Sequence, residues 1–345
     1  MAVSLEPAPL EPMEARSQDD LPEGPGWQFE PKWDGFRCLA LRRAGRVDLR
    51  AKSGKPLGRY FPDIVEGLDA LHERDFLLDG ELAIAVGTSL SFEALQLRLH
   101  PAESRVRKLA AQSPAFLIVF DLLRLGERDL STSPLRARRS ELERFHHRHS
   151  GSSVLRLSPA TQNRATARRW LAKVGGAIDG VVAKRLDEPY APGERAMIKV
   201  KRLRSADCVV GGFRRERGSK LVASILLGLY DEAGLLHHVG FVSALAETDK
   251  PALTKKLERL VGSSAFSGRA PGAPSRWSRE RSSEWTPLRP ELVVEVRYDH
   301  ATGDRLRHGA TVLRWRPDKA ARQCGLDQLG HEARPGVLVR GLLRA

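Results

Sequence analysis

The arrangement of strand-length segments changes at Arg204, and this change is the strongest limit on how the chain can fold. Before it, apolar segments of strand length, such as 76–86 and 115–125, alternate with amphipathic helical ones such as 133–149. After it, five strand-length segments follow one another, with a helical segment, 250–262, after the third; they are 207–217, 222–231, 235–245, 291–299 and 311–318. Consecutive strands with one intervening helix are typical of a small closed barrel such as an OB-fold. We therefore predict an α+β protein in which a mixed domain precedes a barrel.

The length of 345 residues is sufficient for one large and one smaller domain. Residues 1–25 are rich in proline and glutamate without periodicity, and we interpret them as an extended lead-in. The first domain is predicted over 26–205 and the second over 206–345. The second domain contains a stretch near 263–286 that is rich in Ser, Gly, Pro and Arg, and we predict a flexible insert there.

The charge of the chain favours a polyanionic partner. Its 57 lysines and arginines exceed its 43 acidic residues, which gives a net charge of +14. Basic residues that neutralise phosphates release condensed counterions, and this release drives association with nucleic acid. Nucleic acid is therefore the favoured partner, and a merely basic soluble protein is the alternative.

Nothing in the sequence indicates a membrane or secretion. No apolar run approaches the roughly 20 residues that a membrane span needs. The N-terminus lacks the basic and then apolar order of a secretory signal. Cys38, Cys208 and Cys324 are widely spaced and form no C-x-x-C pair, so neither a disulfide framework nor a zinc site is indicated. We expect a cytoplasmic protein without membrane association.

The segment FEPKWDGFR, residues 29–37, places Lys32 between the carboxylates of Glu30 and Asp34. An amine attacks phosphorus only when it is unprotonated, whereas a free lysine, with a pKa of about 10.4, is mostly protonated at neutral pH. Asp34 by itself works against deprotonation, but a Mg²⁺ ion at the phosphates of a substrate repels the ammonium and can reverse that effect. The residues alone therefore leave two interpretations open, a nucleophile and the charged end of a hairpin.

The same segment resembles the nucleotidyl-acceptor motif of the superfamily that contains ATP-dependent DNA ligases, RNA ligases and messenger-RNA capping guanylyltransferases. In that superfamily the lysine forms a covalent adduct with a nucleoside monophosphate. Further segments resemble the later motifs in the same order: DGEL at 79–82, FLIVFDLL at 116–123, DGVVAKR at 179–185, IKVKR at 198–202 and LRWRPDK at 313–319. The resemblance covers nearly the whole chain. It implies a nucleotidyltransferase domain with mixed sheets, followed by an OB-fold domain.

The resemblance implies catalytic roles in both domains. The residues concerned are Lys32, Lys199, Lys201, Arg316, Asp318 and Lys319. Lys32 is expected to be the nucleophile. Lys199 and Lys201 are two residues apart, so on a strand both point to one face, where they can stabilise charge on the α-phosphate. The residues of the sixth motif are expected to act on the triphosphate in the first step.

The resemblance also implies a nucleotide site and a metal site. The residues expected at the nucleotide are Glu30, Arg37, Lys52, Glu81, Phe120 and Lys184. Glu30 is expected to read adenine, and Phe120 is expected to stack on the base. Asp179 and Glu81 are expected to bind Mg²⁺ or Mn²⁺. Viewed alone, Phe120 could as well be a core residue, and Glu81 could as well be a side chain on the exposed side of its strand. The order of the motifs favours the roles at the nucleotide site.

Two positions depart from the pattern of the superfamily. Asp179 stands where glutamate is usual, and the shorter side chain shifts the metal contact by about one methylene. Ala51 and Lys52 stand where a serine and an arginine are common. Lysine keeps the positive charge there but loses the bidentate fork of arginine.

Within the superfamily, the residues around the motifs are similar to those of small, stand-alone bacterial ATP-dependent DNA ligases associated with repair and end joining. Segments 100–106 and 183–195 carry part of this likeness. It implies a monomer at the nucleoid that uses ATP, binds nicked or broken duplex DNA and works with other repair proteins, without an attached polymerase or nuclease module. The alternatives are an RNA ligase, a capping guanylyltransferase and a DNA-binding scaffold without catalysis, which the retained lysines disfavour.

The predicted helix over 133–149 has Ser133 as its expected N-cap. Its histidine-rich end, 146–149, lies on the polar side, and we interpret it as solvated rather than as a metal site.

Overall fold

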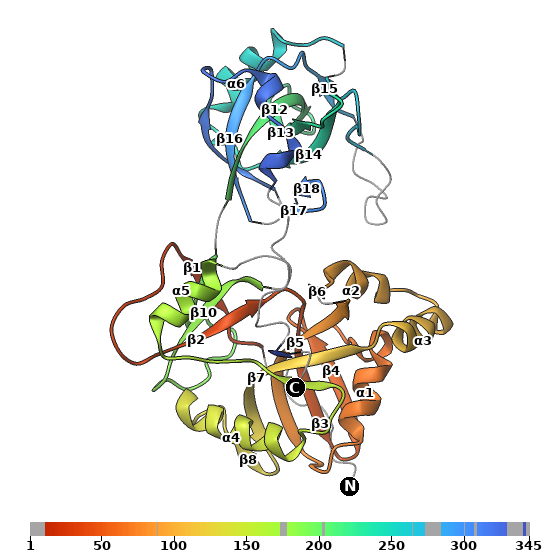
Figure 1. Cartoon of the computed structure of the whole chain (residues 1–345), viewed down its shortest axis with the longest axis vertical. Coiled ribbons are helices and arrows are strands. Elements are labelled where there is room, and N and C mark those ends of the chain that lie inside the picture. The colour runs from red at the N-terminus through yellow and green to blue at the C-terminus, as the bar shows by residue number, and fades with distance from the viewer. Residues whose placement is uncertain are drawn as a thin grey trace. The chain divides into compact units, whose positions relative to one another are not determined.

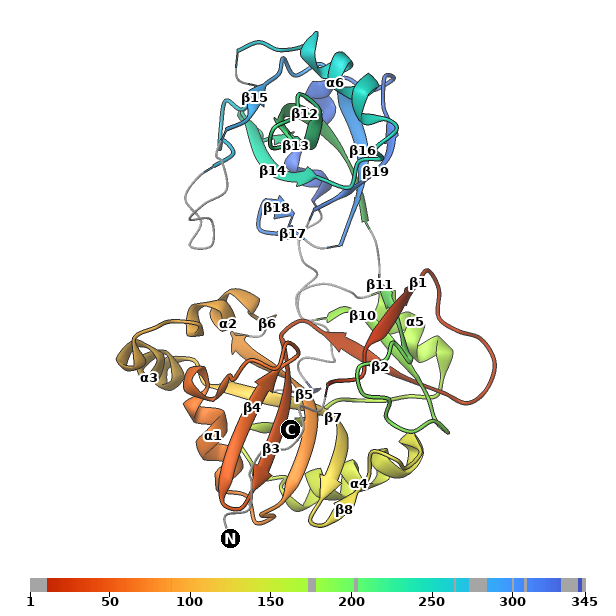
Figure 2. The ribbon, with the colours of Figure 1, turned by 180° about the vertical axis from the view of Figure 1, so that it is seen from behind.

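The computed structural model describes residues 11–87, 89–172, 178–201, 204–263, 265–272, 284–299, 301–306, 309–329 and 341–342. These residues form two compact units, the first within Met1–Arg202 and Glu332–Ala345 and the second within Leu203–His331. Figure 1 labels the helices and strands, and Figure 2 shows them from behind. No helix in the described part is long and apolar enough to cross a membrane.

The first unit contains a sheet of seven strands, counted over the described residues. Its main path runs β4-β3-β5-β7-β8, while β6 pairs with β5 and β9 pairs with β7. The strands are β3 (Phe36–Arg43), β4 (Arg46–Ala51), β5 (Phe76–Val86), β6 (Ser89–Leu90), β7 (Ala115–Leu125), β8 (Arg128–Asp129) and β9 (Leu155–Leu157). The strands predicted over 76–86 and 115–125 are confirmed. The β3–β4 hairpin turns at Ala44 and Gly45, both at positive φ, as a tight two-residue turn requires.

Helices cover one face of this sheet. The helices of the first unit are η1 (Gly58–Tyr60), α1 (Pro62–Asp69), α2 (Phe92–Arg98), α3 (Glu103–Gln112), α4 (Leu135–Arg148) and α5 (Arg164–Ala172). Ile64 and Leu68 of α1 and Phe145 of α4 are fully buried in one apolar core with side chains of the sheet. The apolar sides of α1 and α4 therefore pack against one face of this sheet.

The N-terminus of α4 differs from the prediction. The N-cap residue is Pro134, and no side-chain hydrogen bond caps the helix, so the prediction that Ser133 caps it was wrong. The carbonyl of Ser133 instead accepts a hydrogen bond of 2.6 Å from Arg138. Arg138 is buried and also donates to both carboxylate oxygens of Asp121, at 2.9 and 3.0 Å. A buried arginine thus fixes this end of the helix.

The histidine-rich end of α4 is also not simply solvated. His149 is 6% exposed, and its imidazole contacts the carboxylate of Glu73. Its ring stacks on His72, with the centroids 6.2 Å apart, and packs against Phe145. The interpretation of the segment as solvated was therefore wrong for His149, because this C-cap residue of α4 packs against Phe145 of the core.

A second sheet of the first unit has four strands in the order β1-β11-β10-β2, as far as the described residues extend. The strands are β1 (Ala15–Gln18), β2 (Trp27–Trp33), β10 (Ile178–Arg185) and β11 (Met197–Lys201). Helix α5 packs on one face, where Ala167 lies in an apolar core with Phe29 and Val200. β1 lies within the predicted lead-in and pairs in parallel with β11, so residues 15–18 belong to this sheet; residues 1–10 lie outside the described part.

The second unit is built on an antiparallel sheet whose described strands follow the order β14-β13-β12-β16-β19, with β15 beside β12. Its elements are β12 (Arg204–Arg215), β13 (Val222–Tyr230), β14 (Leu236–Val242), α6 (Lys250–Glu258), β15 (Thr286–Pro287), β16 (Val293–Tyr298), β17 (Ala301–Thr302), β18 (Arg305–Leu306), β19 (Thr311–Trp315), η2 (Ala321–Gln323) and η3 (Leu326–Gln328). The first strand pairs with both the second and the fourth, and the helix follows the third. This is the arrangement of an OB-fold, a partly open five-stranded barrel.

The predicted boundary near Ser205 falls inside β12, which begins at Arg204. Of the predicted insert near 263–286, residues 264 and 273–283 lie outside the described residues.

Candidate active site

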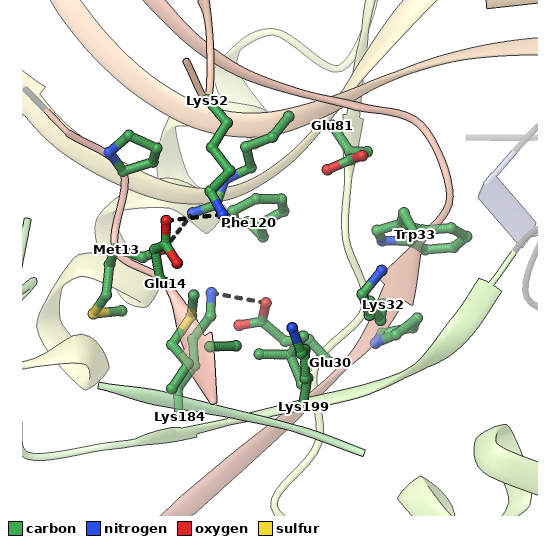
Figure 3. A pocket seen from close by; sticks show the side chains of 16 residues that line it. Met13, Glu14, Glu30, Lys32, Trp33, Lys52, Glu81, Phe120, Lys184 and Lys199 are labelled. Atoms are coloured by element: carbon green, nitrogen blue, oxygen red, sulfur yellow. Dashed lines mark hydrogen bonds and ion pairs between the residues drawn. The ribbon is translucent and has the colours of Figure 1, made fainter. Parts of the chain in front are cut away.

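A cavity of about 270 Å³ in the first unit is lined by strands of both sheets. Its lining residues are Pro12, Met13, Glu14, Ala15, Glu30, Pro31, Lys32, Trp33, Arg37, Lys52, Glu81, Phe120, Val182, Lys184, Met197 and Lys199. In Figure 3, Lys32, Lys184 and Lys199 point into it from the lower side, and Lys52 and Glu81 from the upper side. Residues far apart in the sequence therefore meet around one space.

Strand alternation explains why charged side chains reach this cavity. Successive side chains of a strand point to opposite faces. In β5, Leu82 is buried in the core beneath the helices, and the adjacent Glu81 lines the cavity. In β11, Ile198 and Val200 are buried in the core against α5, and Lys199 between them lines the cavity. The same apolar pattern that builds the two cores therefore directs the polar residues into the space between the sheets.

Lys32, at the cavity end of β2, is paired with a carboxylate. Its Nζ atom donates a hydrogen bond of 2.8 Å to Asp179 Oδ2. Burial by itself lowers the pKa of Lys32, but the Asp179 carboxylate, followed by those of Glu81 and Asp34, outweighs it, so the pKa is raised overall. The amine is therefore protonated at neutral pH in this arrangement.

Glu81 lies close to the turn that follows Lys32. Its Oε1 atom accepts a hydrogen bond of 3.1 Å from the backbone N–H of Gly35. A Cβ atom at position 35 would lie 2.1 Å from the carbonyl oxygen of Leu82, so this approach requires glycine. Burial raises the pKa of Glu81 to about 7, against the opposing charges of Lys32 and Arg37. Glu81 is thus a carboxyl group that changes its charge near neutral pH.

Lys199 and Lys201 lie on the face of β11 that is opposite to its core residues. Lys201 Nζ is 3.8 Å from Asp179 Oδ2. Burial lowers the pKa of Lys199, and the neighbouring ammonium groups of Lys201 and Lys32 lower it further. Repulsion among these cations would be relieved by a bound anion, as expected at a phosphate site.

A second group at the cavity surrounds the ring of Phe120. Lys184 Nζ is 4.7 Å from the ring centroid, and Arg37 Cζ is 4.8 Å from it. Lys184 also forms a buried ion pair of 2.9 Å with Glu30, whose other oxygen accepts a hydrogen bond of 2.8 Å from Gln28. An aromatic face, a carboxylate and cations therefore meet at one end of the cavity, a combination that can stack on a base and hydrogen-bond to it.

Sequence reasoning missed the buried chain of contacts that holds Arg37. Arg37 donates to both carboxylate oxygens of Asp79, at 2.6 and 2.5 Å. The hydroxyl of Tyr190 donates to Asp79 over 2.7 Å and accepts a hydrogen bond of 2.8 Å from the N–H of Met13. Burial and then the Asp79 carboxylate raise the pKa of Tyr190. Asp79 lies in the DGEL segment, but no local pattern links it to Tyr190, which is far away in the sequence.

Residues of the predicted lead-in also reach the cavity. Glu14 Oε1 lies 2.8 Å from Lys52 Nζ, and this hydrogen bond lowers the pKa of Glu14. Both residues line the cavity, as does Met13. No sequence pattern predicts that Glu14 reaches the cavity, because its position depends on the pairing of β1 with β11, a strand near the end of the first unit.

The residues of the sixth motif lie together in the second unit, around an aspartate that sequence reasoning missed. Arg316 Nη1 donates to both oxygens of Asp207, at 3.0 and 3.2 Å, and Lys319 Nζ is 2.7 Å from Asp207 Oδ2. Arg316 also donates to Asp318. The hydrogen bond with Asp318 raises the pKa of Arg316, and the Arg316 guanidinium lowers the pKa of Asp318 to about 2. The structure thus joins these three predicted residues into one charged cluster.

The donors near Lys32 fit a divalent cation that arrives with a nucleotide. Within the described ranges, no group of three or more His, Cys, Asp or Glu side chains is placed to hold a metal ion. The carboxylates of Asp179 and Glu81 nevertheless both lie near enough to Lys32 to raise its pKa. Mg²⁺ is usually bound through one or two carboxylates, with substrate phosphates supplying further oxygen ligands. Two carboxylates beside three lysines are consistent with that mode.

Comparison with known proteins identifies the family. The profile of the ATP dependent DNA ligase domain matches residues 12–201, and that of the ATP dependent DNA ligase C terminal region matches residues 218–319. DNA ligase C2 of Mycolicibacterium smegmatis is 44% identical over 93% of this chain and 94% of its own length. The multifunctional non-homologous end joining DNA repair protein LigD of Mycobacterium tuberculosis is 30% identical over 85% of this chain and 36% of its own length.

A likeness to solved structures supports the fold. The structure described as Pmar-Lig_Pre. has a TM-score of 0.60 at 17% identity and covers 88% of this chain and 68% of its own. The first family profile spans more than half of the chain, and the similarity to DNA ligase C2 runs through both units. The chain belongs to the family of ATP-dependent DNA ligases.

Proposed function

We propose that Lys32 is the nucleophile of this DNA ligase and carries AMP as a covalent intermediate. The neutral amine attacks the α-phosphorus of ATP; a bond between Nζ and phosphorus forms, and the bond to pyrophosphate breaks. AMP then passes to the 5′-phosphate of a break, and the 3′-hydroxyl displaces it to form the phosphodiester. The observation that carries the proposal is the position of Lys32 in the cavity, beside Asp179 and on the same side as Lys199.

The ion pair with Asp179 has to be weakened before Lys32 can react, because an ammonium has no lone pair. We infer that Asp179 and Glu81 hold Mg²⁺ or Mn²⁺ when ATP is present. The cation would neutralise phosphate charge and, by repelling the ammonium, favour loss of its proton. A metal ion at Asp179 would occupy the carboxylate that now pairs with Lys32, so Asp179 would couple metal binding to the loss of the proton, which passes to solvent.

Other residues of the cavity bind and orient the nucleotide in this proposal. Lys199 and Lys201 stabilise the charge that develops on the α-phosphate, since both lie on one face of β11. Phe120 offers its ring to the base, and Glu30 accepts from the exocyclic amine of adenine. The buried pair of Glu30 with Lys184 supports this role, because it orients the carboxylate.

The same proposal gives Arg37 and Lys52 contacts with the ribose or the phosphates. Both line the cavity, and the bidentate contact with Asp79 fixes the orientation of Arg37. The usual arginine of the superfamily is replaced by Lys52, whose ammonium is already paired with Glu14. A phosphate would have to compete with that carboxylate.

In the second unit, we propose that Arg316, Asp318 and Lys319 act on the pyrophosphate end of ATP during the first step. Positioning and neutralisation of charge do most of the work in phosphoryl and nucleotidyl transfer. The contacts of Arg316 and Lys319 with Asp207 support the proposal, because they hold two cations in a fixed arrangement.

The substrate we propose is nicked or broken duplex DNA during repair, with the protein acting as a monomer at the nucleoid beside other repair proteins. The similarity to LigD, which is named as a non-homologous end joining DNA repair protein, supports a role in end joining. The net charge of +14 supports binding to a polyanion.

The experiment that tests the nucleophile is incubation with α-labelled ATP or GTP, followed by denaturation and then by a sealing assay on nicked duplex. Label from ATP should stay on the denatured protein, and the labelled protein should seal the nick. Labelling by GTP alone would reject the adenine site, and sealing without any protein-bound label would reject the lysine intermediate.

A further inference from the structure

The second unit contains a cationic cluster that the proposed nucleotide chemistry does not use. It consists of Arg214 on β12, Arg269 in the segment 265–272 and Arg305 on β18, gathered around His238 on β14. Arg305 Nη2 lies 3.4 Å from His238 Nδ1. Figure 2 shows β18 close to β14, and the two strands are in contact. One guanidinium group therefore contacts the histidine ring, and the charges of the other two act on it.

Backbone contacts build this cluster into the fold. The N–H of Gly268 donates to the carbonyl of Leu236 over 3.0 Å, and the carbonyl of Arg269 accepts from the N–H of His238 over 2.8 Å. A Cβ atom at position 268 would lie 2.5 Å from Cε1 of His237, so only glycine lets the segment run this close to β14. Arg269 is thus fixed beside His238 by the main chain.

Polar atoms of the cluster lack partners. His238 is 7% exposed, and neither its Nε2 atom nor Nε of Arg269 has a hydrogen-bond partner among the described residues. Over the same described ranges, the guanidinium of Arg269 donates to the carbonyl of Asp304 and that of Arg305 contacts the ring of His238, and no carboxylate pairs with either of them. Buried polar groups in folded proteins are nearly always paired with protein, water or a ligand, so these atoms are available to an incoming ligand.

The charges around His238 indicate the sign of that ligand. Burial lowers the pKa of His238 to about 4, and the charges of Arg305, Arg214 and Arg269 contribute to the shift. Burial and then Arg269 also lower the pKa of Arg305. Positive groups that lower the pKa of their neighbours in this way are stabilised in their charged form by a bound anion. Guanidinium groups match the oxygens of phosphate especially well.

We propose that Arg214, Arg269 and Arg305 bind one phosphodiester group of the DNA backbone, with His238 behind them. The site deepens the proposed function and rests on it, because the phosphate comes from the DNA that is sealed. Arg305 is exposed and Arg214 and Arg269 are half-buried, so a macromolecule can reach the cluster. This accessibility favours DNA over the other phosphate source in the reaction, the released pyrophosphate.

The test is the salt dependence of binding to a nicked duplex, measured with the full chain between about 50 and 200 mM salt. Arg269→Gln and Arg305→Gln should each weaken binding, and each should reduce the slope of log K against log salt by about 1. Arg217→Gln, at an exposed arginine between β12 and β13, is the control for loss of one charge. Slopes equal to that of the control in both variants would overturn the proposal.

Arg305→Lys separates charge from geometry. It should keep the slope of the wild type, because the counterion is still displaced, but bind more weakly, because the bidentate fork is lost. If thermal unfolding shows that Arg305→Gln does not fold, the test rests on Arg305→Lys. An affinity of Arg305→Lys for the nicked duplex equal to that of the wild type would contradict the proposal.

Self-adenylation without DNA distinguishes this site from the proposed nucleophile. Failure of the wild-type protein to take label from ATP would reject the role of Lys32 and leave the DNA-binding measurement intact. Slower adenylation in Arg269→Gln together with an unchanged salt slope would assign the cluster to pyrophosphate and overturn the DNA proposal.

Discussion

Lys32 Nζ donates a hydrogen bond to Asp179 Oδ2 over 2.8 Å, so the proposed nucleophile and a proposed metal ligand form one ion pair. The contact keeps the lysine protonated while no cation competes for the carboxylate. A metal ion at Asp179 would reverse the sign of the charge next to the ammonium. In the proposed mechanism, activation of the amine and binding of the metal with ATP would thereby be coupled through a single residue.

Lys32→Ala should abolish covalent labelling by α-labelled ATP, because no amine remains at that position in the cavity. The measurement is the label that stays on the denatured protein. Lys55→Ala, at an exposed lysine of the first unit, is the matched control and should be labelled like the wild type. Labelling of Lys32→Ala at the level of this control would show that Lys32 is not the nucleophile.

The rate of self-adenylation should rise with pH, since the raised pKa of Lys32 leaves little free amine at pH 7. Burial lowers this pKa and Asp179 raises it, so Asp179→Asn should move the midpoint of the pH–rate profile to lower pH. The maximal rate should fall at the same time, because a proposed metal ligand is lost. An unmoved midpoint would show that Asp179 does not set the protonation of the lysine.

Glu81 should make the protein less stable as the pH rises. Burial raises its pKa from 4.5 to about 7, so the folded state holds the proton more tightly than the unfolded state does. The stabilisation is complete below about 4.5 and is lost as the pH rises through about 7. Glu81→Gln stays neutral and should flatten this part of a profile of urea midpoints against pH. The exposed Glu93→Gln is the control, and identical profiles for the two variants would contradict the expectation.

Lys199→Ala and Lys201→Ala should each slow adenylation by on the order of 100-fold, the usual effect of removing one preorganised donor at a developing anion. Single-turnover rates at saturating ATP measure this loss, and Lys55→Ala again controls for the loss of a positive charge. Near-normal rates in both variants would mean that this face of β11 does not contact the α-phosphate.

Much of the fold was predictable because it follows from local periodicity. Strands β5 and β7 and the five main strands of the second unit are apolar runs of strand length, which favours strands over helices. β1 could not be found in this way. Its four residues, ARSQ, are mostly exposed, and its pairing partner β11 lies near the other end of the first unit.

The candidate site was predictable only where a short motif carries it. Lys32, Glu81 and Lys199 lie in such motifs and meet at the cavity. Tyr190 and Asp207 carry no signal of their own, because their roles depend on partners more than 100 residues away, Asp79 in one case and Arg316 in the other. Such contacts become visible only once the chain is folded.

The last prediction concerns the division of labour between the two units. If Arg316, Asp318 and Lys319 act on the triphosphate, their triple replacement by alanine should slow the loading of AMP onto Lys32. Sealing of nicks that already carry a 5′-adenylate should be retained, because that reaction starts after loading. Asp207→Asn should have the same selective effect in a weaker form, since the carboxylate holds Arg316 at 3.0 Å and Lys319 at 2.7 Å. The comparison of adenylation with sealing of pre-adenylated nicks uses the same protein preparation, so a folding defect would reduce both reactions alike. Equal loss in both would assign the sixth motif to folding or DNA binding, and its role at the triphosphate would have to be abandoned.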